Sequence, residues 1–189
     1  DIYFRQEGNK MIGESTLLLA NEGPQPLPTP VLYLNPGLRV TALRGHDNEE
    51  LPYHRESQAI ILQTPLPPGE ETLVRLTYEG PIDEAVCFPD FTDEEFHDTR
   101  LRCFFRGYDS RFRHGRCFAR VGDNYTLLFP ECLWYPVAIP PVNVNTPLAR
   151  QYDFTRYRLK VGNVGQRVAI SQGKMTTNGD TAIFTNHQP

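Results

Sequence analysis

Residues 31–80 have the sequence VLYLNPGLRVTALRGHDNEELPYHRESQAIILQTPLPPGEETLVRLTYEG, and they set the expected fold class. Short apolar runs alternate there with turn-forming Gly, Pro and Asn, and no helical period is present. Near the end of the stretch, Val74, Leu76 and Tyr78 share one face of a strand candidate, while the positions between them are polar. A half-buried strand has this alternation. The stretch therefore predicts an antiparallel sheet.

Strand candidates continue on both sides of this stretch. In chain order they are residues 11–21, two short strands within 31–43 that break at 35–37, then 51–55, 58–64, 73–79, 125–129, 152–161, 167–171 and 181–185. With nine to twelve short strands and no internal repeat, the chain suits a two-sheet antiparallel β-sandwich. We expect one domain over residues 1–189.

Composition supports many short strands and excludes some functions. The 189 residues include 17 prolines and 14 glycines, which punctuate the sequence at short intervals. A net charge of -4 gives no overall field that would attract nucleic acid or an anionic membrane. No apolar run reaches the roughly 18 residues that cross a bilayer. The chain starts without Met or a signal-peptide core, so we expect a piece excised or processed from a longer parent.

Residues that carry chemistry are scarce. None of the five histidines belongs to a His-Glu-x-x-His pair, and the sequence contains no Gly-x-Ser-x-Gly elbow and no phosphate-binding glycine loop. We therefore predict that this chain is not itself an enzyme and has no catalytic, cofactor-binding or metal-binding residues. The four cysteines are Cys87, Cys103, Cys117 and Cys132. Their spacing is not that of a zinc site, and disulfides and buried thiols both stay open.

Residues 81–120 form a charged insertion in which the strand pattern fades. Residues 83–98 contain seven carboxylates and no Lys or Arg, and residues 100–120 contain seven arginines and one Asp. One short helix is expected at 92–97. The arginines alternate with aromatic residues, as in proteins that bind single-stranded nucleic acid. Because the acidic block nearly cancels the basic one, pairing of the two blocks within the chain is the favoured interpretation.

A proline-rich loop around Trp134 and Tyr135 is too apolar to be a solvated linker. Three interpretations stay open for it. The aromatic rings plug one end of the sandwich, they anchor a contact with a neighbouring domain, or they stack on a sugar ring.

The order of several short motifs resembles that of a known family. These motifs are LNPGLRV at 34–40, IIL at 60–62 with PLPPGE at 65–70, LTYEG at 76–80, FPEC at 129–132 with WYP at 134–136, YRLKV at 157–161 and VAISQG at 168–173. In this order they resemble the N-terminal β domain of the gluzincin aminopeptidases, the aminopeptidase N family. The loop reads FPEC and WYP where the family has Phe-Pro-Cys and Asp-x-Pro. In this departure the chain resembles a divergent bacterial branch of the family, in which the peptidase-like portion is often fused to membrane segments.

The resemblance implies a saddle-like sandwich that precedes a thermolysin-like zinc domain beginning after residue 189. It implies that zinc belongs to that missing domain and not to this chain. It also implies a docking loop, with Glu131, Trp134 and Tyr135 as the candidate residues at the domain interface or the edge of a peptide-substrate cleft. An extracytoplasmic, membrane-associated parent follows from the resemblance alone. The alternative is an independent β-sandwich module that binds protein or glycan.

Overall fold

The computed structural model describes residues 1–83, 119–129, 132–138 and 156–186. These residues form strands with no helix longer than a single turn, which confirms the predicted all-β class. The charged insertion lies outside the described residues except at its ends. So do the expected helix at 92–97 and Cys87, Cys103 and Cys117.

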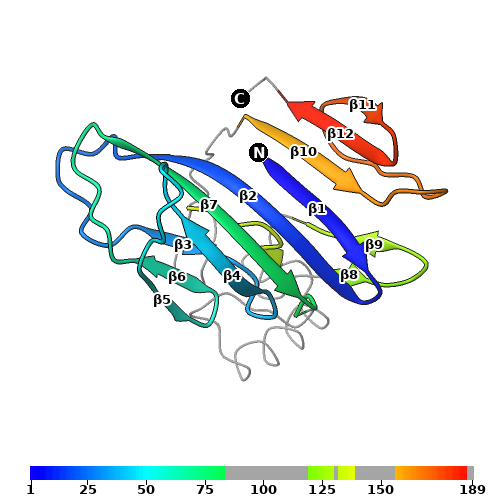
Figure 1. Cartoon of the computed structure of the whole chain (residues 1–189), viewed down its shortest axis with the longest axis horizontal. Coiled ribbons are helices and arrows are strands. Elements are labelled where there is room, and N and C mark those ends of the chain that lie inside the picture. Colours follow the sequence, from blue (N-terminus) through cyan, green and yellow to red (C-terminus); the bar gives the residue numbers. More distant parts are fainter. Residues whose placement is uncertain (84–118, 130–131, 139–155, 187–189) are drawn as a thin grey trace, which may run out of the picture.

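The largest sheet has seven strands in the order β11-β12-β10-β1-β2-β7-β4 (Figure 1). In chain order these are β1 (Ile2–Glu7), β2 (Lys10–Ala20), β4 (Arg39–Arg44), β7 (Glu71–Gly80), β10 (Tyr157–Gly162), β11 (Lys174–Asn178) and β12 (Thr181–Asn186). Five of the seven overlap predicted strands, and the sequence pattern predicts neither β1 nor β11. β1 runs parallel to β10 and antiparallel to β2, so the sheet is mixed at this one pair.

A second sheet has three strands in the order β3-β6-β5: β3 (Val31–Tyr33), β5 (Tyr53–Glu56) and β6 (Ala59–Leu62). A two-stranded hairpin, β8 (Arg120–Val121) and β9 (Thr126–Leu127), completes the described structure. β3, β4, β5, β6 and β7 all lie in the quoted stretch of residues 31–80. That stretch therefore contributes to both sheets, as expected of the part of the chain that sets the fold.

The core lies between the two sheets and forms one cluster. Its buried apolar side chains are contributed by both sheets and by the segment after the insertion: Phe4, Met11, Leu32, Leu34, Leu38, Leu43, Ile60, Leu62, Val74, Leu76, Tyr78, Ile82, Ala119, Cys132, Trp134, Leu159, Ala182 and Phe184. Val74, Leu76 and Tyr78 are almost fully buried, as their alternation predicted. The two-sheet sandwich is thus confirmed.

Gly13 explains how the middle of the large sheet accommodates Tyr78. The two residues are directly opposite each other on β2 and β7. A Cβ atom on Gly13 would lie 2.2 Å from the Tyr78 ring, so no larger residue fits without moving that ring. The Tyr78 hydroxyl shares a buried hydrogen bond of 3.0 Å with the Ser15 hydroxyl.

One predicted strand is wrong. Residues 167–171 form no strand, and the strand that pairs with β12 is β11, Lys174–Asn178. The two-residue turn at Gly179 and Asp180, where Gly179 has a φ of +57°, fixes the hairpin register and brings residues 174–178 opposite residues 181–185. The alternation at 167–171 was real, but it separates exposed from half-buried side chains in an irregular segment.

Candidate domain interface

The predicted docking loop is described over residues 132–138, and the backbone of β3 holds it against the smaller sheet. The Tyr33 amide donates to the Val137 carbonyl at 2.8 Å, and the Val137 amide donates back at 3.1 Å. The Asn35 amide donates to the Leu133 carbonyl at 2.8 Å. Leu133 has a φ of +55°, which is uncommon for a residue with a side chain and marks a tight local bend.

The buried side chain of Asn35 joins three separate segments. Its Nδ2 donates to the Cys132 carbonyl at 2.8 Å and to the Asp83 carbonyl at 3.2 Å. Its Oδ1 accepts from the Gly37 amide at 3.0 Å and from the Asp83 amide at 2.9 Å. All the hydrogen-bonding positions of this amide are therefore used, which makes Asn35 the anchor of the loop.

Trp134 packs into the core instead of standing in solvent. Its side chain is 8 % exposed, and its ring meets Phe4 edge-on with the centroids 6.0 Å apart. Tyr135 contacts Trp134 in a T-shaped pair at 4.7 Å and is half-buried. A sugar ring stacks on an exposed aromatic face, and Trp134 does not offer one. Glu131 lies outside the described residues.

Tyr78 lies beneath this loop and is electrostatically coupled to it. Burial raises the pKa of Tyr78 above its ordinary value of 10, the hydrogen bond from Ser15 opposes that rise, and Tyr135 adds to it. The neutral phenol is thus the form that the folded chain stabilises.

The Cys132 thiol is buried at the start of the loop, and its Sγ donates to the Phe129 carbonyl at 2.9 Å. Within the described ranges, no group of three or more His, Cys, Asp or Glu side chains could hold a metal ion. The same ranges contain no helix with the length and apolarity that a bilayer crossing needs.

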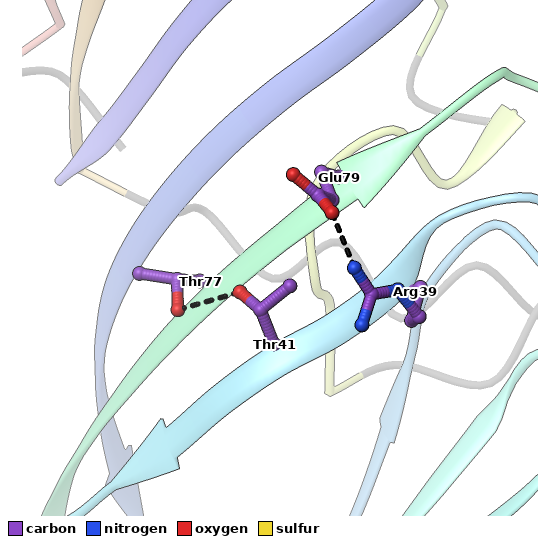
Figure 2. Close-up of polar contacts among 4 residues, drawn as sticks. All are labelled: Arg39, Thr41, Thr77 and Glu79. Atoms are coloured by element: carbon purple, nitrogen blue, oxygen red, sulfur yellow. Dashed lines mark hydrogen bonds and ion pairs between the residues drawn. The ribbon is translucent and has the colours of Figure 1, made fainter.

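β4 forms one edge of the large sheet, and polar side chains on it bond to polar side chains on its neighbour β7. Figure 2 shows Arg39 paired with Glu79, and Thr41 donating to Thr77 at 3.0 Å. All four residues lie at the surface, so the ion pair contributes little stability. A β-bulge between Val40 and Ala42 interrupts the pairing of β4 with β7. Bulges of this kind discourage the addition of another strand at a sheet edge, so this edge is a poor docking site.

Sequence reasoning missed an exposed apolar surface at another place. Tyr125, Leu127 and Phe129 were assigned to a strand and Val168 and Ile170 to another, which implied burial for some of them. All five are exposed. The alternation shows correctly which side chains share a face. It does not tell which of the two faces meets solvent.

Comparison with known proteins gives a match at the level of the fold. No family model matches the chain, and no curated protein matches it by sequence. Among solved structures, 80 chains match. One is a two-domain M1 zinc metallopeptidase bound to L-tryptophan, with 17 % identity and a TM-score of 0.56 over 98 % of this chain. Another is an M1 zinc metallopeptidase from Deinococcus radiodurans, with 18 % identity and a TM-score of 0.54 over 97 % of this chain.

The coverage of those neighbours is partial. The chain spans 38 % of the length of the first neighbour and 37 % of the length of the second. The described sandwich is therefore a fold that M1 zinc metallopeptidases contain as one part of a longer polypeptide. This confirms, for the fold, the resemblance seen in the order of the sequence motifs.

Proposed function

We propose that this chain is the non-catalytic N-terminal domain of an aminopeptidase-like metallopeptidase parent. The observation that carries the proposal is the pair of coverages, because 98 % of this chain matches 38 % of a zinc metallopeptidase chain. The remaining part of the parent would supply the peptidase-like domain.

Zinc is assigned to that second domain. The residues of this chain that the structure describes provide no cluster of ligands for it. The zinc would polarise the scissile carbonyl and activate water in the parent. This chain would contribute shape, by closing one side of the cleft that holds the peptide substrate.

The loop that carries Glu131, Trp134 and Tyr135 is the proposed contact with the cleft. Its support is the anchoring described above: Asn35 fixes the backbone, and Trp134 fills the core beneath Tyr135. Of the two aromatic residues in this loop, Trp134 is buried and Tyr135 keeps part of its surface exposed. Trp134 would then act as a positioning residue that holds the Tyr135 ring in place.

The parent polypeptide and the 189-residue chain, purified side by side, test the proposal. We expect about one zinc per parent molecule by metal analysis, turnover of an aminoacyl 4-nitroanilide, and neither property in the 189-residue chain. Chelation of the zinc should abolish turnover and its replacement should restore it. A parent that binds no zinc and cleaves no aminoacyl substrate would refute the peptidase assignment.

Tyr135→Ala in the parent tests the role of the loop. If Tyr135 borders the cleft, the substitution should raise KM several-fold with a smaller change in kcat, because it removes binding that is equal in ground and transition states. Leu18→Ala, at an exposed apolar position on β2, is the matched control and should change neither constant. Equal kinetics for both variants would remove Tyr135 from the cleft.

A further inference from the structure

Five large apolar side chains are exposed near one another, on the β8–β9 hairpin and on the connection from β10 to β11. We call them the hairpin–loop patch: Tyr125, Leu127, Phe129, Val168 and Ile170. The first three are 43–54 % exposed, and Val168 and Ile170 are 83 % and 90 % exposed. Isolated exposed apolar residues are normal, but a group of this kind marks an interaction site.

The outward direction of these side chains follows from the backbone alternation. Leu128 lies between Leu127 and Phe129 and packs against the core, and Ala169 does the same between Val168 and Ile170. Residues two apart in an extended segment point the same way. Each segment thus has one inward residue that fixes it to the core and outward residues that stand in solvent.

The side chain of Gln6, on β1, holds the two segments together. Its Oε1 accepts from Thr126 Oγ1 at 2.6 Å and from Arg167 Nη1 at 3.2 Å. Its Nε2 donates to the Gly122 carbonyl at 2.9 Å. In Figure 1 the hairpin and the connection between β10 and β11 both lie toward the right-hand end of the large sheet. The patch is consequently one surface and not two separate exposures.

Further contacts fix the shape of the patch. The Val164 amide donates to the Asp180 carbonyl at 3.1 Å, and the Arg167 amide donates to the Val164 carbonyl at 2.9 Å. On the hairpin, the Arg120 guanidinium lies 5.2 Å from the centroid of the Tyr125 ring. A surface that is ordered before it binds loses little conformational entropy on binding, which suits a folded partner.

We propose that the hairpin–loop patch is an apolar surface on which the second, peptidase-like domain of the parent docks, in addition to the cleft contact proposed for the loop that carries Trp134 and Tyr135. This inference rests on the proposed function. The occupant is argued from length, because more than half of each of the two metallopeptidase chains compared above lies outside the part that this chain covers. A folded domain joined to this one in the same polypeptide provides an apolar partner surface at high effective concentration.

Site-resolved cysteine labelling tests the assignment. Val168→Cys and Ile170→Cys would be treated with a maleimide in the 189-residue chain and in the parent, with rates read by peptide mass spectrometry and normalised to the denatured protein. Leu18→Cys is the matched control, because Leu18 is 61 % exposed and lies on a different strand. We expect residues 168 and 170 to label at least tenfold more slowly in the parent than in the 189-residue chain, and residue 18 to label equally in both.

Each other outcome overturns the assignment. Rapid labelling at 168 and 170 in a parent that binds zinc and turns over substrate would leave the proposed function intact and refute the docking surface. Slow labelling in the 189-residue chain would mean that its own residues or a second copy cover the patch. Protection that appears only with vesicles of phosphatidylcholine and phosphatidylglycerol would assign the patch to a lipid surface. A parent that binds no zinc and cleaves no substrate would refute the proposed function, and with it the docking surface that rests on it.

Ile170→Asp in the parent gives a second readout that does not depend on labelling. A charge buried at a domain interface should uncouple the two domains, so that one thermal unfolding transition becomes two. The same substitution in the 189-residue chain should leave its melting temperature within about 2 °C, as expected for a surface position. Leu18→Asp in the parent should keep the single transition. A single transition in both parent variants would contradict the docking surface.

Discussion

The loop at residues 132–138 and the segment at residues 163–173 are both connections that contain large apolar side chains, yet these side chains have opposite environments. Trp134 is 8 % exposed, whereas Ile170 is 90 % exposed. The first segment has buried polar partners, since Asn35 bonds the Cys132 carbonyl and Tyr33 pairs with Val137. The second is fixed at the surface, by Gln6 and by the turn that contains Asp180. Burial is therefore decided by where the backbone is anchored more than by local apolarity.

Trp134→Ala should produce the largest loss of stability. The substitution leaves a cavity against Phe4 and Tyr135, and the free energy of unfolding should fall by about 3–5 kcal/mol. Urea denaturation of the 189-residue chain measures it. Tyr125→Ala, at an exposed aromatic, should cost less than about 0.5 kcal/mol. If the two variants are equally stable, the contrast between the two segments is wrong.

Asn35→Ala tests the anchor itself. Removal of the amide leaves two carbonyls and two backbone N–H groups without that partner, and we expect a loss of about 2–4 kcal/mol. The measurement is again urea denaturation. Gln63→Ala removes an exposed amide and should change the free energy of unfolding by less than about 0.5 kcal/mol. An Asn35 variant as stable as the Gln63 variant would show that the loop does not need this side chain.

Tyr78 gives a pH test of the core beneath the loop. Its pKa is higher in the folded chain than the ordinary value of 10, so the unfolded chain loses the proton first as the pH rises. The associated stability is fully present below pH 10 and falls above it, by up to about 1.4 kcal/mol per pH unit. Tyr78→Phe should remove this part of the slope. If the stability of the Tyr78→Phe variant and that of the unsubstituted 189-residue chain fall in parallel between pH 9 and 11, Tyr78 is not the source of this slope.

Ile170→Ala should have the smallest effect. The side chain is almost fully exposed in the 189-residue chain, so its truncation should change the free energy of unfolding by less than about 0.5 kcal/mol. Ile60→Ala, at a fully buried isoleucine, is the matched control and should cost about 2–5 kcal/mol. A substantial loss with Ile170→Ala would show that the hairpin–loop patch is already packed within this chain.

Alternation in the sequence predicted most of the sandwich, and two of its failures have physical causes. In β1, Phe4 is in the core and Ile2 packs against it, and the polar Gln6, two residues after Phe4, breaks the apolar alternation. Gln6 is tolerated at this position because its amide bonds Gly122 and Thr126. At residues 167–171 the apolar alternation is intact, but the hairpin that turns at Gly179 and Asp180 gives the pairing positions to residues 174–178.

The candidate interface was harder to predict than the fold. The aromatic composition of the loop identified Trp134 and Tyr135 as notable residues, but it does not tell a core ring from a contact ring. That distinction depends on Asn35 and Phe4, which are about a hundred residues away along the chain. The exposure of the hairpin–loop patch was also missed, because tertiary placement, and not local alternation, decides which face of a segment meets solvent.

The parallel pairing of β1 with β10 fixes an order of events during synthesis. The hairpin of β1 and β2 is complete once Ala20 has been made, but the other neighbour of β1 begins at Tyr157. At about 5–20 residues per second, the ribosome needs on the order of ten seconds to deliver it. An unpaired strand edge that persists for that time invites association between nascent chains. Chaperone occupancy on translating ribosomes should therefore rise before β10 emerges and decline once it has joined the sheet.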